Sequence, residues 1–196
     1  MSAVEIRNAA VHRKSQETTV DVELNLDGRG EADIRTGSRI FDHFLSQIAR
    51  HGLFDLKITA NGADIHHVVE DVAICLGQAF YKALGEKRGI SRMGWVVVPM
   101  DEALVQVAVD LGGRGYAQVE APPGPVAELA PDLVRHFFSS LALEGKMNLH
   151  SQILRGGNEH HVAEALFKAL GRALDMACRL DYRLGDRLPS TKELIE

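Results

Sequence analysis

Cysteine and proline are both scarce in this chain. Its 196 residues include two cysteines and six prolines, and 45% of them are hydrophobic. Cys75 and Cys178 lie within apolar helical patterns, where a reduced thiol behaves as a small buried hydrophobe. We therefore expect neither a disulfide nor a thiolate metal ligand. The low proline content and the apolar fraction predict packed domains and exclude a disordered chain.

An excess of positive charge and long apolar runs are also missing. The formal net charge of -5 offers no basic stripe for a nucleic-acid backbone. No apolar run approaches the roughly 20 residues that cross a bilayer, and the first residues contain no apolar signal core. We expect a cytoplasmic protein that binds neither nucleic acid nor a membrane.

Histidine is the one residue in surplus, and most of the nine histidines belong to an internal repeat. Val20–Gly30 matches Val105–Gly115 at an offset of 85, which also aligns Glu17 with Glu102. His43–Gly52 matches His136–Gly145 at an offset of 93. His66–Glu70 (HHVVE) matches His160–Glu164 (HHVAE) at an offset of 94, which aligns Gly77 with Gly171. Ordered matches at a nearly constant offset indicate a duplicated unit of about 90 residues. We expect a first unit over 1–92 and a second over 93–185.

The two units share one predicted secondary structure. Alternating apolar residues in VDVELNL and LVQVAVDL indicate half-buried strands. A second strand, a helix, a further strand and a long helix that opens at the paired histidines follow in each unit, with room for one more strand. This order predicts an α+β fold in which each unit is a mainly antiparallel four-stranded sheet with helices on one face.

The paired histidines point away from the predicted core. At about 100° per residue, His66, His67 and Glu70 share one flank of their helix, opposite an apolar stripe that includes Val72 and Leu76. Because adjacent imidazoles diverge by about 100°, His66 and His67 are poorly placed to chelate one ion together. The two histidines of each pair are therefore predicted to serve different ions.

Eight residues form the predicted ligand set. A lone histidine on a helix flank is usually only solvated, but here the motif is duplicated and a further histidine recurs on each preceding helix. The candidates are His43, His66, His67, Glu70, His136, His160, His161 and Glu164. They divide into two sites of three imidazoles and one carboxylate, a set that suits manganese, iron, cobalt, nickel or zinc.

Six motifs extend the pattern to nearly the whole chain. They are RKSQET (Arg13–Thr18), FDHFL (Phe41–Leu45), HHVVED (His66–Asp71), PMDEAL (Pro99–Leu104), GNEHHVAEALFKALGRAL (Gly157–Leu174) and LPSTK (Leu188–Lys192). In this combination the chain resembles the imidazoleglycerol-phosphate dehydratase family. The resemblance implies two tandem halves of the ribosomal protein S5 domain 2-like fold and a lyase that dehydrates imidazole glycerol phosphate to imidazole acetol phosphate in histidine biosynthesis.

The resemblance also implies a cofactor, an assembly and residue roles. Two Mn2+ ions per active site would bind the imidazole or imidazolate of a small phosphate substrate, in a 24-mer whose active sites lie between subunits. The eight candidates above would be the metal ligands, and Glu17 would contact substrate as an acid/base. Arg92, Arg114, Ser190 and Lys192 would hold the substrate, and 186–196 would form a C-terminal substrate-binding tail.

Two other functions use a similar ligand set. A dinuclear metallohydrolase would attack a phosphate or an amide with a bridging hydroxide, but such enzymes usually bridge their metals with carboxylates. A metal-storage or structural-metal oligomer would have closed sites and no need for the basic residues Arg92 and Arg114. The sequence favours the dehydratase over both.

Overall fold

The computed structural model describes residues 7–195 and consists of two units with the same order of elements. The first unit contains β1 (Asn8–Lys14), β2 (Thr18–Asn25), β3 (Ala32–Arg35), α1 (Arg39–Gly52), β4 (Asp55–Gly62) and α2 (Ile65–Leu84). The second contains β5 (Met93–Met100), β6 (Ala103–Asp110), β7 (Tyr116–Val119), α3 (Pro131–Glu144), β8 (Asn148–Arg155) and α4 (Glu159–Cys178). The predicted α+β duplication is confirmed, and the strand for which the sequence left room precedes the alternating one.

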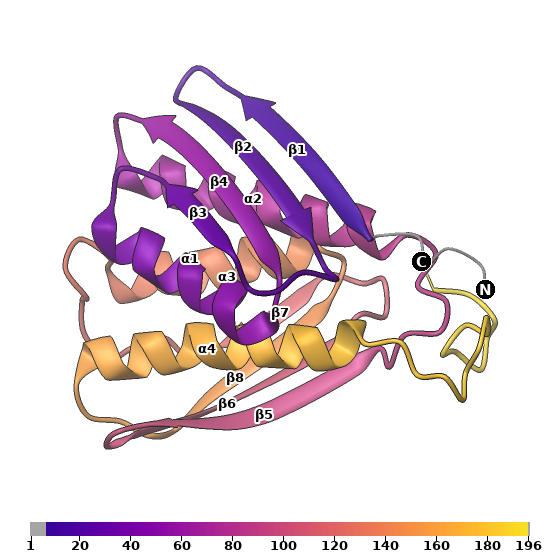
Figure 1. Cartoon of the computed structure of the whole chain (residues 1–196). Coiled ribbons are helices and arrows are strands. Elements are labelled where there is room, and N and C mark those ends of the chain that lie inside the picture. Colours follow the sequence, from indigo (N-terminus) through magenta and orange to yellow (C-terminus); the bar gives the residue numbers. More distant parts are fainter. Residues whose placement is uncertain (1–6, 196) are drawn as a thin grey trace.

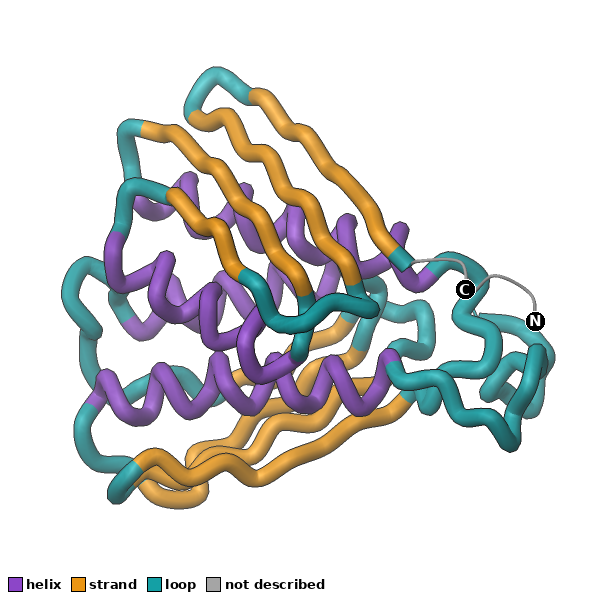
Figure 2. Tube along the Cα trace, in the orientation of Figure 1, coloured by secondary structure: helices purple, strands orange, loops and turns teal. Residues whose placement is uncertain are grey.

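Each unit forms one four-stranded mixed sheet. The strand orders are β1-β2-β4-β3 and β5-β6-β8-β7, in which only the last pair of each sheet, β3 with β4 and β7 with β8, is parallel. The four helices lie between the two sheets, so that each sheet has one covered and one open face (Figure 1; Figure 2). Apolar residues that alternate along β2 and β6 face this helical layer and are buried.

The long helices of the two units begin in the same way. Asp64 caps α2, where its side chain accepts a hydrogen bond from the His66 amide. Asn158 caps α4 and accepts from the amides of His160 and His161. Since a capping side chain satisfies amides that have no partner within the helix, these two residues fix the start of each helix and place the paired histidines in its first turn.

The structure buries the helix residues of the predicted apolar stripes. Val72, Leu76 and Phe80 of α2 are fully buried, as are Leu166 and Leu170 of α4. The shorter helix α1 ends at Gly52, and Leu53 follows in the left-handed conformation. The histidines thus stand on the flanks that these stripes leave uncovered.

Glycines set how closely the helices of the two units approach. A Cβ atom added at Gly171 of α4 would lie 2.7 Å from the Ile48 carbonyl oxygen of α1, and one added at Gly77 of α2 would lie 2.7 Å from that of Leu141 in α3. These are equivalent positions in the two units. Each unit's long helix therefore packs tightly against the shorter helix of the other unit.

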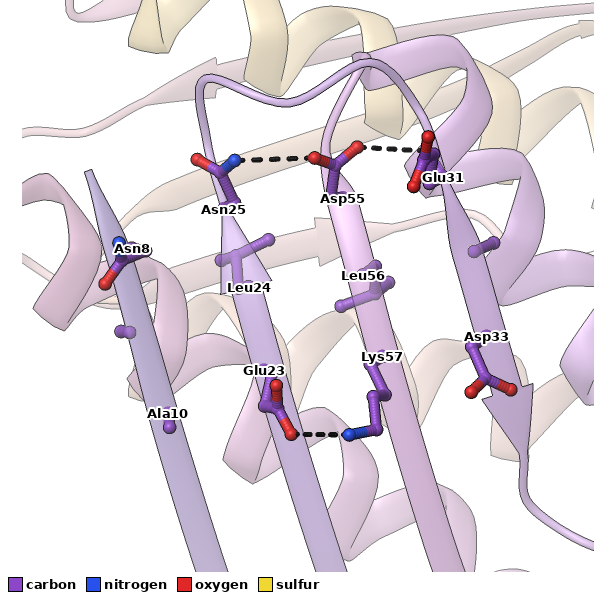
Figure 3. Close-up of a pocket in the computed structure, with 12 residues that line it drawn as sticks. Asn8, Ala10, Glu23, Leu24, Asn25, Glu31, Asp33, Asp55, Leu56 and Lys57 are labelled. Atoms are coloured by element: carbon purple, nitrogen blue, oxygen red, sulfur yellow. Dashed lines mark hydrogen bonds and ion pairs between the residues drawn. The ribbon is translucent and has the colours of Figure 1, made fainter. Parts of the chain in front are cut away.

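The open face of the first sheet holds a cavity of about 510 Å³ (Figure 3). Its polar groups already have partners: Lys57 donates to Glu23 at 2.8 Å, and Asp55 accepts from the backbone amide of Glu31 at 3.1 Å. None of the predicted site residues lines it. Among the described residues, no helix is long and apolar enough to cross a membrane.

Replacing Gly171 by alanine tests the close approach of α1 and α4. The added methyl meets backbone at 2.7 Å, and overpacking of this kind costs up to about 3 kcal/mol. Alanine's better helix propensity recovers about 1 kcal/mol, so we expect a loss of about 2 kcal/mol in the free energy of unfolding, measured in urea. Gly156→Ala is the control, because its nearest neighbour, Ile153, lies at 3.9 Å. Equal stability of the two variants would contradict the packing argument.

Candidate metal centre

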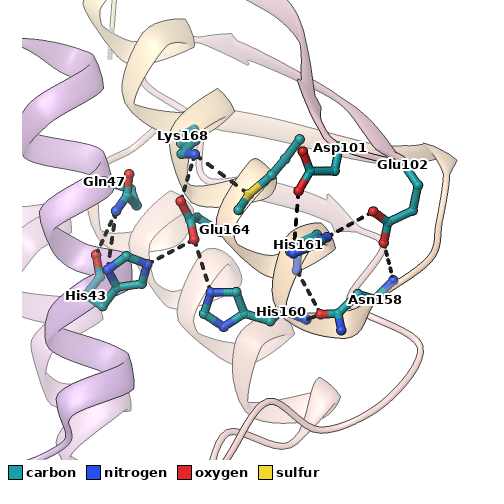
Figure 4. A network of polar contacts seen from close by, with 10 residues as sticks. His43, Gln47, Asp101, Glu102, Asn158, His160, His161, Glu164 and Lys168 are labelled. Atoms are coloured by element: carbon teal, nitrogen blue, oxygen red, sulfur yellow. Dashed lines mark hydrogen bonds and ion pairs between the residues drawn. The ribbon is translucent and has the colours of Figure 1, made fainter.

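Three predicted ligands meet where α1 packs on α4 (Figure 4). The Nε2 atoms of His43 and His160 lie 3.0 and 3.1 Å from Oε2 of Glu164. The two imidazole rings are nearly parallel, at 15°, with centroids 5.7 Å apart. We call His43, His160 and Glu164 the first cluster; one imidazole comes from the first unit, and the other two groups come from the second.

Glu164 is the buried member of this cluster. Its side chain is 9% exposed and pairs with Lys168, whose Nζ atom lies 2.7 Å from Oε1. Burial raises the pKa of the Glu164 carboxyl, but hydrogen bonds and charge from Lys168 and His43 outweigh burial and lower the pKa to about 2. The carboxylate is therefore ionised at neutral pH, as a metal ligand must be.

A second cluster, His66, Glu70 and His136, lies on α2 and α3. Nε2 of His136 is 3.3 Å from Oε1 of Glu70, and the rings of His66 and His136 are 5.6 Å apart at 20°. Here the carboxylate and one imidazole come from the first unit and His136 comes from the second. The two clusters are thus equivalent under the duplication, and each combines residues of both units.

The chemistry of both clusters fits a metal ion. In each, one atom from every residue lies within 4.8 Å of the others, and the set of nitrogen and oxygen donors without thiolate suits a divalent transition metal. His136 adds a direct sign, because its buried Nε2 atom lies 3.3 Å from Oε1 of Glu70 yet makes no hydrogen bond among residues 7–195. A buried polar atom without a partner is costly, and coordination would satisfy it.

The other histidine of each pair lies outside these clusters. The rings of His66 and His67 meet at 88°, and those of His160 and His161 at 73°. His67 points its Nε2 atom toward Glu17, at 3.7 Å from Oε2. Because His66 lies with Glu70 and His136 while His67 lies near Glu17, the adjacent histidines diverge as the helical spacing predicts. That all eight residues are ligands stays a prediction, since the chain brings six of them together in two groups of three.

Glu102 contacts the second histidine of α4 and did not stand out in the sequence. Its Oε2 atom lies 2.9 Å from Nδ1 of His161, and its Oε1 accepts from the amide of Asn158 at 2.6 Å (Figure 4). The hydrogen bond from the Asn158 amide has the largest effect on the pKa of Glu102, and the one from His161 the next largest. Together they lower that pKa to about 2. The repeat carried the signal that could have found this residue, because Glu17 aligns with Glu102.

Asp71 is a second residue that sequence reasoning missed. Its buried carboxylate accepts from Nε of Arg13 at 2.7 Å and from the Thr18 hydroxyl. Ser15 Oγ in turn accepts from the amides of Glu17 and Thr18, at 3.1 and 3.0 Å. These bonds fasten the turn between β1 and β2 to α2, so the turn that carries Glu17 is held beside His67.

Four of the five predicted substrate-binding residues, all but Glu17, line a separate cavity of about 560 Å³: Arg92, Arg114, Ser190 and Lys192. Arg92 is already engaged there: its guanidinium donates to both oxygens of Asp110, at 2.7 and 3.0 Å, and to the Pro189 carbonyl at 2.9 Å. It therefore holds the C-terminal tail in place. Arg114 is exposed and has the freer side chain.

This basic cavity and the first cluster lie at opposite ends of α4. The Arg92 amide donates to the carbonyl of Ala177 in the last turn, whereas His160 is in the first turn. At 1.5 Å per residue, the helix between them spans about 25 Å. Figure 1 shows the C-terminal tail beside the end of α4. Within one chain, the first cluster and the basic cavity therefore cannot hold the same small substrate.

The comparisons with known proteins agree on one family. The family model for imidazoleglycerol-phosphate dehydratase matches residues 36–174. An imidazoleglycerol-phosphate dehydratase from Dehalococcoides mccartyi is 56% identical over 192 residues, covering 97% of this chain and 98% of the relative. One from a Roseiflexus species is 54% identical over 194 residues, covering 96% and 98%.

Solved structures of this family share the fold. The crystal structure of the enzyme from Pyrococcus furiosus superposes with a TM-score of 0.82 at 34% identity, covering 94% of this chain and 99% of the other. That from Staphylococcus aureus gives a TM-score of 0.80 at 32% identity, covering 89% and 99%.

Lys168→Met tests the charge balance at Glu164. A carboxyl whose pKa is lowered in the folded state contributes stability that is present above its unfolded value near 4.5 and is lost as the pH falls toward 2. Without Lys168 the folded pKa rises, so we expect the chelated protein to unfold at a higher pH, followed by circular dichroism. Lys82→Met replaces an exposed lysine of α2 and serves as the control. Coincident acid transitions for both variants would refute this account.

Proposed function

Because the chain belongs to the imidazoleglycerol-phosphate dehydratase family, hydro-lyases of histidine biosynthesis, we propose that it dehydrates imidazole glycerol phosphate at a site that holds two manganese ions. The observation that carries the proposal is the pair of equivalent clusters, each with two imidazoles and one carboxylate. One cluster per ion accounts for two metals. A storage protein would not need the basic cavity at the far end of α4.

Each ion needs one more imidazole than its cluster supplies. We assign His43, His160 and Glu164 to one ion and His66, Glu70 and His136 to the other. His67 and His161 stand outside both clusters within their own chain, so each would complete a site on another copy. When bound, the two ions would stabilise the substrate's imidazole ring as an imidazolate, which supplies the electron sink that the dehydration requires.

The proposed active site therefore lies between subunits, in a 24-mer. Two features of the single chain support a site between subunits. His67 and His161, outside the clusters, are partly exposed, and about 25 Å of helix separates the first cluster from the cavity lined by Arg92, Arg114, Ser190 and Lys192. If one copy supplied the cavity and another the metal ligands, the substrate's phosphate would lie in the cavity while its imidazole met the ions.

Glu17 is the proposed acid/base. The proton to be moved lies on a carbon without a neighbouring carbonyl, so a positioned carboxylate must accept it. No hydrogen bond to the Glu17 carboxylate is recorded among residues 7–195, and it lies on the Nε2 side of His67. The bonds of Asp71 to Arg13 and Thr18 hold the turn that carries Glu17. The Glu17 carboxylate therefore stays beside His67, a proposed ligand.

In the phosphate cavity we assign the direct contacts to Arg114, Lys192 and Ser190. Two cations and a hydroxyl match the charge and the acceptor oxygens of a phosphate. Arg92 completes the positive cavity and, through Pro189, orders the tail that carries Ser190 and Lys192. We retain 186–196 as the substrate-binding tail and the division between the units at 92 and 93.

A cytoplasmic location is part of the proposal. Both cysteines are buried free thiols. Burial raises the pKa of Cys75 to about 11 and that of Cys178 to about 12, which leaves them protonated and unreactive. Buried free thiols are typical of proteins in a reducing compartment.

The proposal is tested by removing the metal and restoring it. We expect chelated protein to lose the conversion of imidazole glycerol phosphate to imidazole acetol phosphate, and added Mn2+ to restore it, in a coupled assay of product. The same assay without added imidazole glycerol phosphate measures the background. Absence of any manganese-dependent product would overturn the proposed function.

Glu17→Gln tests the acid/base assignment. The amide keeps the size of the side chain but cannot accept a proton, and general acid-base catalysis typically contributes about 10²- to 10⁴-fold. We expect kcat to fall by about that factor while manganese binding stays unchanged. Glu23→Gln, which removes an exposed carboxylate paired with Lys57 on the open sheet face, is the control. Near wild-type turnover of Glu17→Gln would exclude Glu17 from proton transfer.

A further inference from the structure

The duplication has produced two equivalent carboxylates that meet their histidines differently. Glu102 contacts Nδ1 of His161 at 2.9 Å. Its repeat counterpart Glu17 faces the other ring nitrogen, Nε2, of His67 at 3.7 Å, beyond hydrogen-bond distance. The two glutamates therefore stand on opposite sides of equivalent imidazoles.

Small differences between the units explain this divergence. A Cβ atom at Gly157 would lie 2.2 Å from Cγ of Glu102, so the glutamate occupies space that only a glycine leaves open. At the offset of 94, the first unit has Ala63 in place of Gly157. A glutamate placed as Glu102 is would meet this methyl group, and Glu17 instead belongs to the turn that Asp71 holds.

One hydrogen bond ties Glu102 to the capping residue of α4, and two more tie that residue to the first turn. Oε1 of Glu102 accepts from the Asn158 amide at 2.6 Å, while the Asn158 side chain accepts from the amides of His160 and His161, at 2.9 and 3.3 Å. The carboxylate is thus fixed to the same turn as the ring that it contacts. The orientation of the His161 ring is set from within its own chain.

The contact with Glu102 also determines the tautomer of His161. An ionised carboxylate only accepts hydrogen bonds, so Nδ1 carries a proton, and in the neutral ring Nε2 keeps the lone pair that a metal ion needs. Asp101 does not compete for that nitrogen, because its nearest oxygen lies 3.8 Å away. A carboxylate that binds the second ring nitrogen of a ligating histidine fixes the ring and strengthens it as a ligand.

We propose that Glu102 is a positioning residue that presents Nε2 of His161 to a metal ion of the assembled site, whereas Glu17 has been kept free for proton transfer. This inference rests on the proposed function, since it takes His161 as a ligand. It assigns different tasks to two residues that the duplication made equivalent. Glu102 acts through His161 and touches neither the substrate nor the metal.

Manganese binding to chelated protein, measured by calorimetry, tests the inference. We expect Glu102→Ala to weaken one of the two ions per chain by about 10- to 100-fold and to leave the other unchanged. The Mn2+ concentration for half-maximal activity should rise by a similar factor, so that excess manganese recovers most of the lost activity. Glu102→Gln, whose amide oxygen still accepts the Nδ1 proton, should weaken binding less.

Two further variants separate positioning from structure and charge. Gly157→Ala keeps Glu102 but fills its space, so it should reproduce the weaker binding. Glu17→Ala removes the equivalent carboxylate and should bind both ions as the wild type does, with a loss of turnover that excess manganese does not restore. Urea unfolding of each chelated variant checks that the fold is intact.

The outcomes distinguish this inference from the function on which it rests. Wild-type affinity for both ions in Glu102→Ala and Gly157→Ala would overturn the positioning role and leave the dehydratase intact. Equal weakening by Glu17→Ala would also overturn it, because general negative charge would then explain the effect. A wild-type protein that binds no manganese would overturn the proposed metal function and this inference together.

Discussion

The close packing of α1 on α4 and of α2 on α3 is the constraint on which the candidate centres depend. Gly171 and Gly77 let each long helix approach the backbone of a shorter helix from the other unit. At that separation, the His43 imidazole reaches Glu164, and His136 reaches Glu70. The core stripes bury one side of each helix and so direct the ligand flank toward its neighbour. The geometry of both candidate centres therefore depends on helix packing.

Much of this arrangement could be predicted from the sequence, because it follows from local periodicity. The repeat predicts two equivalent units, and helical spacing sets the divergence of His66 from His67. The partnership of His43 with His160 could not be derived in the same way, since it depends on which helices of the two units pack together. The distance between the first cluster and the cavity beside Arg92 could not be derived either, because it depends on Arg92 packing against the far end of α4. Both are tertiary facts that no local pattern contains.

The two missed residues show a different limit. Asp71 and Glu102 act by holding other groups, and the sequence gives such residues no distinctive spacing. Asp71 is significant because Arg13 and Thr18 reach it from β1 and β2, and Glu102 because Gly157 leaves room for its side chain. At the offset of 94, Asp71 aligns with Ala165. One unit therefore secures a turn with a partly buried ion pair, and the other secures a histidine with a glutamate that also binds the helix cap.

The shared composition of the clusters has a genetic consequence. Because each centre takes residues from both units, a gene fragment that encodes either unit alone would specify imidazoles and a carboxylate but no complete cluster. Fusion of the two copies in one reading frame supplies both halves in equal amounts and at fixed separation. A substitution that shifts α1 must then be matched by one in α4, so the two halves of the gene are expected to change together.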